Sequence, residues 1–330
     1  MEMFAEFKSR NAADLFQNDQ KLPFERLFET SCDTRGQIVV YATCLQNYQF
    51  RTCLFSIGIF GEVARLFRWD RAGAIVSCPI YYTKAGNLEL VEFLVRFDNS
   101  NHTQRGLDPT VSRATTADSE AFENAIRAAV GGEKTRLLNK LLASVGDDVQ
   151  YPRRRVDVPD DKNGGMASYI IGRSMWPARS PIGRATRFFV AWSKTTNELV
   201  FLKDSWRPNV EGMEGEAHWF KELEGARNIS AFLHGSDVGC VTAKRRAVAP
   251  AIDLPADLPQ HTLTDLYSES LGGFEDMIGY IHYRTVQCEF YIPLEMFTDS
   301  KHLVQIILDV IIGMYLFVPT RLQLLDLPQQ

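Results

Sequence analysis

The sequence predicts an α+β fold in two parts, and three observations carry this prediction. Up to about residue 145, helical and strand-like apolar patterns alternate. A polar, charged and turn-rich stretch follows from Gly146 to Gly165. Beyond Ser168, short strand-like runs predominate. We therefore expect an amino-terminal mixed α/β domain over residues 1–150, a second domain over 166–313 and a divergent tail over 314–330.

The first domain is expected to begin with a helix and continue with hairpins. Val40, Cys44 and Leu45 repeat at helical spacing within residues 37–45. Two runs rich in β-branched and aromatic residues, 52–60 and 62–69, are joined at Gly61 and predict a hairpin. The remaining expectations here are a strand at 74–78, a helix at 88–97 and helical stripes at 122–129 and 137–142.

The second domain is expected to consist mainly of strands. Apolar, β-branched runs predict strands at 169–171, 186–192, 198–203 and 280–291. Between the last two strands, a helix with Phe220 and Leu223 on one face is followed by an exposed loop at 247–259 that is rich in proline and alanine. A last helix begins near Lys301.

Composition limits the class of protein. The 330 residues are 45% hydrophobic and 23% charged, which is typical of a globular protein and excludes disorder or a coiled coil. The net charge of −5 argues against nucleic acid or an anionic membrane as a partner. Residues 303–318 fall short of the ~20 apolar residues of a membrane span. Six cysteines without a Cys-x-x-Cys pair, and a start without signal-peptide character, predict an intracellular protein, cytoplasmic or nuclear, with free thiols.

The candidate chemistry lies in the second domain, in an ordered series of elements. A strand, a glycine turn, a strand, a lysine-bearing strand and an acidic helix follow one another, as in the amino-terminal lobe of a protein kinase. Such a lobe needs a turn whose backbone approaches phosphates, a strand lysine that contacts them and a helix carboxylate that holds the lysine. Gly183 to Thr186 supply the turn, with Ala185 where a second glycine is expected, and Lys203 supplies the lysine.

The carboxylate candidates are Glu214 and Glu216, of which only one can face Lys203 because they are two positions apart on a helix. Each feature alone also has a simpler interpretation. The turn is typical of a plain hairpin, the lysine of an exposed strand edge and the glutamates of a solvated helix face. Their order and spacing together favour the kinase-like interpretation.

Three segments carry a resemblance to a known family: Arg65–Ala74, Gln104–Val111 and Val200–Arg207. They resemble the hallmark segments of the fungal-type protein kinases, and the resemblance runs from about Phe4 to Gly313. It implies a kinase-like fold, ATP and Mg²⁺ as cofactors and phosphotransfer to serine or threonine hydroxyls of a protein substrate. It also implies that ATP lies under Gly183–Thr186 with Lys203 on its phosphates, that Glu214 is the helix partner of Lys203, and that Glu289 sits in the hinge that meets adenine.

Two groups that phosphotransfer requires are missing from the sequence. A kinase uses one aspartate as the base for the substrate hydroxyl and a second to hold Mg²⁺. Neither His-Arg-Asp nor Asp-Phe-Gly occurs, and His234–Asp237 precedes the expected hinge. We therefore expect this chain to be inactive as written, with its catalytic carboxy-terminal lobe lost through a truncated or misread gene. The rival interpretation is a pseudokinase-like module that binds a protein partner, or a remnant without function.

A second resemblance concerns the start of the chain. Glu6-Phe7-Lys8, followed by Gln37-x-x-x-Tyr41 on the next helix, is similar to elements of the restriction-endonuclease-like fold. Such nucleases need a further upstream acid to bind a metal, and only Glu2 remains to supply it. The six histidines show no metal-ligand spacing, so no metal site is expected.

Overall fold

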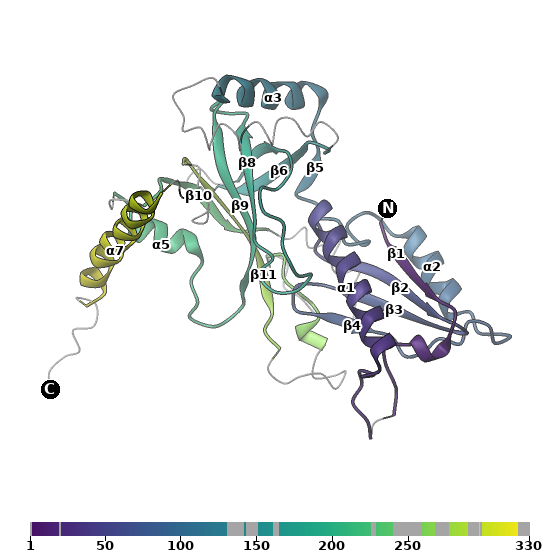
Figure 1. The fold of residues 1–330 in the computed structure, drawn as a ribbon. Helices are drawn as coiled ribbons and strands as arrows, with labels where there is room; N and C mark the ends of the chain where they lie inside the picture. Colours follow the sequence, from purple (N-terminus) through teal and green to yellow (C-terminus); the bar gives the residue numbers. More distant parts are fainter. Residues whose placement is uncertain are drawn as a thin grey trace.

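A computed structural model describes residues 2–19, 21–130, 142, 151–160, 165–225, 229–239, 259–267, 277–289, 297 and 299–322. It contains a four-stranded sheet and a seven-stranded sheet (Figure 1). The first sheet has the order β1-β2-β3-β4 and comprises β1 (Phe4–Lys8), β2 (Leu54–Phe60), β3 (Val63–Trp69) and β4 (Ala74–Val76).

The first sheet is built around a helical crossover. Strands β1 and β2 are parallel, so the chain must cross between them, and α1 (Glu29–Tyr48) makes this connection after the short η1 (Asn11–Ala13). Ile38 and Ala42 of α1 are buried against Leu54 and Phe67 of the sheet. Helix α2 (Glu89–Asn99) follows β4 and places two phenylalanines against β2.

The second sheet is antiparallel and curled. Its order is β10-β11-β9-β8-β7-β6-β5. The strands are β5 (Val111–Arg113), β6 (Arg154–Pro159), β7 (Met166–Ile171), β8 (Arg187–Ser193), β9 (Leu199–Pro208), β10 (Phe232–Asp237) and β11 (Tyr280–Gln287). The curl brings β6 beside β10, where His234 Nδ1 lies 2.9 Å from the Pro159 carbonyl oxygen. The inner face is therefore enclosed by the sheet itself.

Successive side chains of a strand point to opposite faces of the sheet, and this separates two apolar clusters. On the inner face, Phe189 and Ala191 of β8 and Leu202 of β9 pack together, and Phe50, which follows α1, joins them. On the outer face, Val190 and Trp192 of β8 pack against α3 (Thr116–Val130). The remaining described elements are α5 (Glu216–Glu222), η2 (Asp265–Tyr267) and α7 (Ser300–Leu322). In Figure 1, α7 lies at the end of the molecule opposite the first sheet.

Buried carboxylates link the second sheet to the loop that precedes it. Asp204 on β9 accepts hydrogen bonds from Arg187 Nη2 and Arg284 Nε, both at 2.7 Å. Arg284 also donates from Nη2 to Asp108 at 2.6 Å, and Gln260 Nε2 donates to the same aspartate at 2.9 Å. Burial alone would raise the pKa of Asp108, but Arg284 and the other donors around it outweigh burial and lower that pKa to about 2.

A third buried aspartate joins the first sheet to the segment before β11. Asp70 follows β3, and its Oδ2 accepts the backbone N–H groups of Leu263 at 2.8 Å and Thr264 at 3.0 Å. Asp70, Asp108 and Asp204 come one each from the three segments that carry the family resemblance. All three are at most 3% exposed, so these segments contribute to the internal contact between the two sheets.

Most predicted elements are confirmed with small shifts in their bounds. The predicted strands at 52–60, 62–69, 186–192, 198–203 and 280–291 match β2, β3, β8, β9 and β11, and the predicted helix at 37–45 is the middle of α1. The sheets divide the chain earlier than residue 150, because β5 at Val111–Arg113 already belongs to the second sheet. The predicted 247–259 loop and 137–142 stripe lie outside the described residues, apart from Pro259 and Leu142.

None of the helices in the described part of the chain combines the length and the apolar character that crossing a membrane would need.

Candidate functional site

The central feature of the candidate site is an ion pair between Lys203 and Glu216. Lys203 lies on β9 between two neighbouring strands, opposite Phe188 of β8 and Thr285 of β11. Its Nζ donates to Glu216 Oε1, and the same oxygen accepts a hydrogen bond from Arg184 Nη2 at 3.2 Å. The side chains of Lys203 and Glu216 are 16% and 31% exposed, so solvent reaches this pair. The arrangement gathers two cations around one carboxylate at the outer face of the sheet.

Helix α5 begins at Glu216, and this start determines which glutamate meets Lys203. The Tyr283 hydroxyl of β11 accepts a hydrogen bond from the Ala217 N–H at 2.7 Å and thereby holds the first turn of α5 to the sheet. A Cβ on Gly215 would lie 2.7 Å from the Tyr283 ring, so this position has no room for a side chain. Glu214 is exposed in the loop before α5. The expectation that Glu214 is the helix partner is therefore corrected to Glu216.

The glycine turn lies beside the ion pair, but one of its donors is occupied. Gly183 has a φ of +83°, which favours glycine, and Ala185 adopts a positive φ of 41° without being one. The Gly183 N–H donates to the Arg71 carbonyl oxygen at 2.8 Å, so it is not available to a phosphate in this conformation. Thr186 is half-buried and leads directly into β8. Arg184, between the two positive-φ residues, provides the contact to Glu216.

Glu289 lies two residues beyond the end of β11, where its carboxylate turns back toward β10. Its Oε2 accepts hydrogen bonds from the Ser230 hydroxyl and from the Ala231 N–H, the latter at 2.9 Å. The neighbouring Cys288 N–H donates to the Ala231 carbonyl oxygen at 3.0 Å. The Glu289 side chain therefore fixes the start of β10, and no contact between it and Lys203 is found among the described residues.

Two buried polar atoms next to Lys203 were missed by the sequence analysis. Thr285 lies directly opposite Lys203, and Gln287 follows two positions later on the same face of β11. Thr285 Oγ1 and Gln287 Oε1 are both buried without a hydrogen-bond partner. Buried polar atoms in this state are costly and are often satisfied by a ligand or an ordered water. The sequence pattern of an ordinary strand gave no signal for them.

A metal site built from protein alone gathers three or more ligating side chains. Across the part of the chain that the structure describes, no three His, Cys, Asp or Glu side chains are grouped so that they could hold a metal ion. A kinase holds Mg²⁺ through an aspartate after the catalytic loop.

The first sheet brings together residues of the second resemblance. Lys8 Nζ on β1 lies 2.7 Å from Glu6 Oε1 and donates to Gln37 Oε1 of α1, also at 2.7 Å. Tyr41, one turn further along α1, packs its ring edge-on against Phe4 at 5.8 Å between centroids. The structure thus brings a glutamate, a lysine and a glutamine from two separate motifs together at the edge strand.

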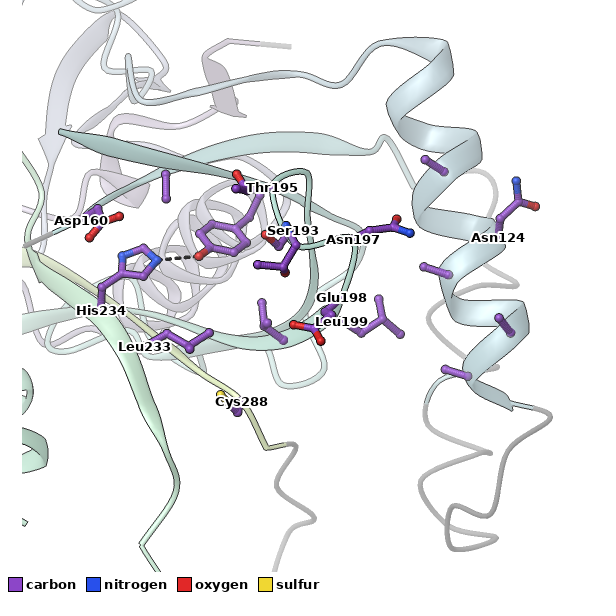
Figure 2. Close-up of a pocket in the computed structure, with 18 residues that line it drawn as sticks. Asn124, Asp160, Ser193, Thr195, Asn197, Glu198, Leu199, Leu233, His234 and Cys288 are labelled. Carbon is purple, nitrogen blue, oxygen red and sulfur yellow. Dashed lines mark hydrogen bonds between the residues drawn. The ribbon is translucent and has the colours of Figure 1, made fainter. Parts of the chain in front are cut away.

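A separate pocket of about 1070 Å³ lies between α3, the β8–β9 turn and the start of β10 (Figure 2). At its base, Tyr169 Oη lies 2.5 Å from His234 Nε2. Because a carbonyl oxygen only accepts, the contact to Pro159 places the histidine proton on Nδ1, and Nε2 accepts from Tyr169. Burial raises the pKa of Tyr169 to about 12, so its hydroxyl keeps its proton. The pair is satisfied internally, and none of the predicted site residues lines this pocket.

Comparison with known protein families shows the family of this chain. The chain matches the model of the fungal protein kinase family over residues 29–319. It therefore belongs to that family, as the hallmark segments predicted. It matches no curated protein and no solved structure.

Proposed function

We propose that residues 1–330 bind an adenine nucleotide at the Lys203–Glu216 pair and do not transfer its phosphate. The observation that carries the proposal is the ion pair itself, on the strand and helix where a kinase-like lobe holds its phosphate-binding lysine. Nearby, Arg184 adds a second cation, which donates to the same Glu216 oxygen. The phosphates of bound ATP would lie against the cations of Lys203 and Arg184.

The chain would hold the nucleotide but lacks the groups for the chemical step. No His-Arg-Asp or Asp-Phe-Gly sequence occurs in residues 1–330. Without a base for the acceptor hydroxyl and a metal ligand, little remains to organise the transition state of phosphotransfer.

The test compares two glutamates that are two positions apart. Isothermal titration of the full chain with ATP should give saturable binding. Lys203→Ala should raise the Kd at least about tenfold, because one charge-assisted contact is lost. Glu216→Gln should also weaken binding, since it removes the negative charge that positions Lys203, whereas Glu214→Gln should leave the Kd unchanged.

Two results would contradict the proposal. If wild-type protein shows no saturable binding of ATP, or if Lys203→Ala protein binds ATP as well as wild type, the nucleotide site at Lys203 does not exist. Transfer of the γ-phosphate to a generic protein acceptor, abolished by Lys203→Ala, would show that phosphotransfer persists.

A second proposal concerns the first sheet. We propose that β1, α1 and β2 share the arrangement of the restriction-endonuclease-like fold without its activity. The contacts of Lys8 with Glu6 and Gln37, and the crossover between parallel strands, support the arrangement. The second acid is not found with them, since Glu2 is held by Arg105 at 2.6 Å. Duplex DNA with Mg²⁺ or Mn²⁺ should therefore stay intact, and cleavage that Lys8→Ala abolishes would contradict this.

A further inference from the structure

The segment between β7 and β8, which carries Gly183, is held by residues of the first sheet and its helix. Asn47, in the last turn of α1, makes a reciprocal pair with Ala178: its Nδ2 donates to the Ala178 carbonyl at 2.7 Å and its Oδ1 accepts the Ala178 N–H at 2.9 Å. The Gly183 N–H donates to the Arg71 carbonyl oxygen at 2.8 Å. Two points of this segment, five residues apart, are therefore attached to another part of the chain.

Arg71 makes a third attachment from the turn between β3 and β4. Its side chain is 3% exposed, and Nη1 donates to Gln46 Oε1 at 2.5 Å and to the Pro181 carbonyl oxygen at 2.9 Å. Both of these acceptors are uncharged, and burial together with nearby Arg187 lowers the pKa of Arg71 to about 9. A buried cation that donates to the segment through a backbone carbonyl fixes that carbonyl in place. It adds little favourable charge pairing of its own.

The attached segment leads directly to the candidate site. The Arg184 carbonyl oxygen accepts the Trp206 N–H of β9 at 2.8 Å, and its guanidinium reaches the glutamate that holds Lys203. Gly183 directly precedes Arg184, so its attachment to Arg71 restrains the backbone that leads to Arg184. A loop that is already ordered loses less conformational entropy when it contacts a ligand.

We propose that Asn47 and Arg71 are positioning residues for the nucleotide. They hold residues 178–184 so that Arg184 stands next to Lys203 and Glu216, where both cations meet the phosphates. The proposal rests on the proposed nucleotide-binding function and adds that the first sheet is part of the binding apparatus. The ligand it concerns is a nucleoside di- or triphosphate, recognised through its phosphates.

The test uses Asn47 because it is half-buried, whereas a change at buried Arg71 endangers folding. Hydrogen–deuterium exchange of the full chain without nucleotide should show faster exchange at the amides of residues 178–186 in Asn47→Ala. Titration with ATP should show a Kd about five- to tenfold higher, as expected when two hydrogen bonds no longer order the loop. Asn47→Asp keeps the acceptor for the Ala178 N–H. Its exchange rate and its Kd should therefore lie between those of wild type and of Asn47→Ala.

The matched control is Asn99→Ala. Asn99 is exposed, and its Nδ2 donates to a carbonyl within its own helix, Val95 of α2, at 2.9 Å. This variant should change neither the exchange nor the Kd.

Four outcomes would overturn the inference. Unchanged exchange at residues 178–186 in Asn47→Ala would show that the contact does not order the segment. Faster exchange with an unchanged or lower Kd would show that the order does not serve binding. If wild-type protein does not bind ATP at all, the proposed function fails and this inference fails with it. If Lys203→Ala abolishes ATP binding and Asn47→Ala does not weaken it, this inference fails and the proposed function stands.

Discussion

At the residue scale, Gly106 illustrates how a single position supports the contact between the sheets. It lies in a hallmark segment, two residues before the buried Asp108, and has a φ of +88°. Its carbonyl oxygen accepts the Thr52 N–H at 2.9 Å. A Cβ at this position would lie 2.1 Å from the Cys53 carbonyl oxygen, which is backbone and cannot move aside. Glycine is therefore required here by both conformation and space.

Gly106→Ala should lower the free energy of unfolding by roughly 2–4 kcal/mol, through the strained backbone and the clash. Urea unfolding followed by circular dichroism measures this change. Gly36→Ala is the matched control, because Gly36 is exposed within α1 and a methyl group added there would meet no other atom within 4 Å. That variant should stabilise the protein by roughly 0.5–1 kcal/mol, since alanine is the better helix former. Equal effects of the two substitutions would contradict this account.

For single residues, a local pattern gives a signal at some positions and none at others. Lys203 was predicted from its strand and its distance from the glycine turn; the structure pairs it with Glu216, and its contact with phosphates stays a prediction. Thr285 and Gln287 gave no such signal. Their unpartnered atoms depend on what β9 and β11 place around them, which a strand pattern does not contain.

At the scale of elements, periodicity predicted most helices and strands but not how they combine. Helix α5 was expected, yet its first residue was not, and a start at Glu216 changes the partner of Lys203. That start depends on the hydrogen bond between Tyr283 and the Ala217 N–H, which joins residues 66 positions apart. Strand β5 likewise pairs with β6 across more than forty residues. A local sequence pattern does not predict which residues pair when they are so far apart in the chain.

The hallmark segments led to the family, but their role was not apparent from the sequence. Their aspartates are charged residues that a pattern assigns to solvent or to catalysis. In the structure, Asp70, Asp108 and Asp204 are buried and accept several hydrogen bonds each. The ionised state of Asp108 and Asp204 is kept by donors from other elements, and burial opposes it. These residues therefore support the fold, while Lys203 in the same segment as Asp204 belongs to the candidate site.

At the scale of the whole molecule, the two sheets are joined into one unit. Arg284 bridges Asp108 and Asp204, Asp70 holds the segment before β11, and Arg71 and Asn47 hold the segment before β8. Phe50, which follows α1, inserts into the core of the second sheet, where its ring lies 5.7 Å from that of Phe189. The proposed nucleotide site depends on this junction, because the loop beside Lys203 is attached to the first sheet.

The most direct test of this junction is hydrogen exchange of the full chain at increasing urea, read separately for peptides of β2–β3 and of β8–β9. We predict that both sheets lose protection at the same urea concentration in wild-type protein. In Asp108→Asn, both transitions should move together to lower urea, because Arg284 loses one of its buried charged partners. The free energy of unfolding should fall by roughly 3 kcal/mol. Separate transitions in wild-type protein, or a shift of only one sheet in Asp108→Asn, would contradict the claim that the hallmark segments join the two sheets.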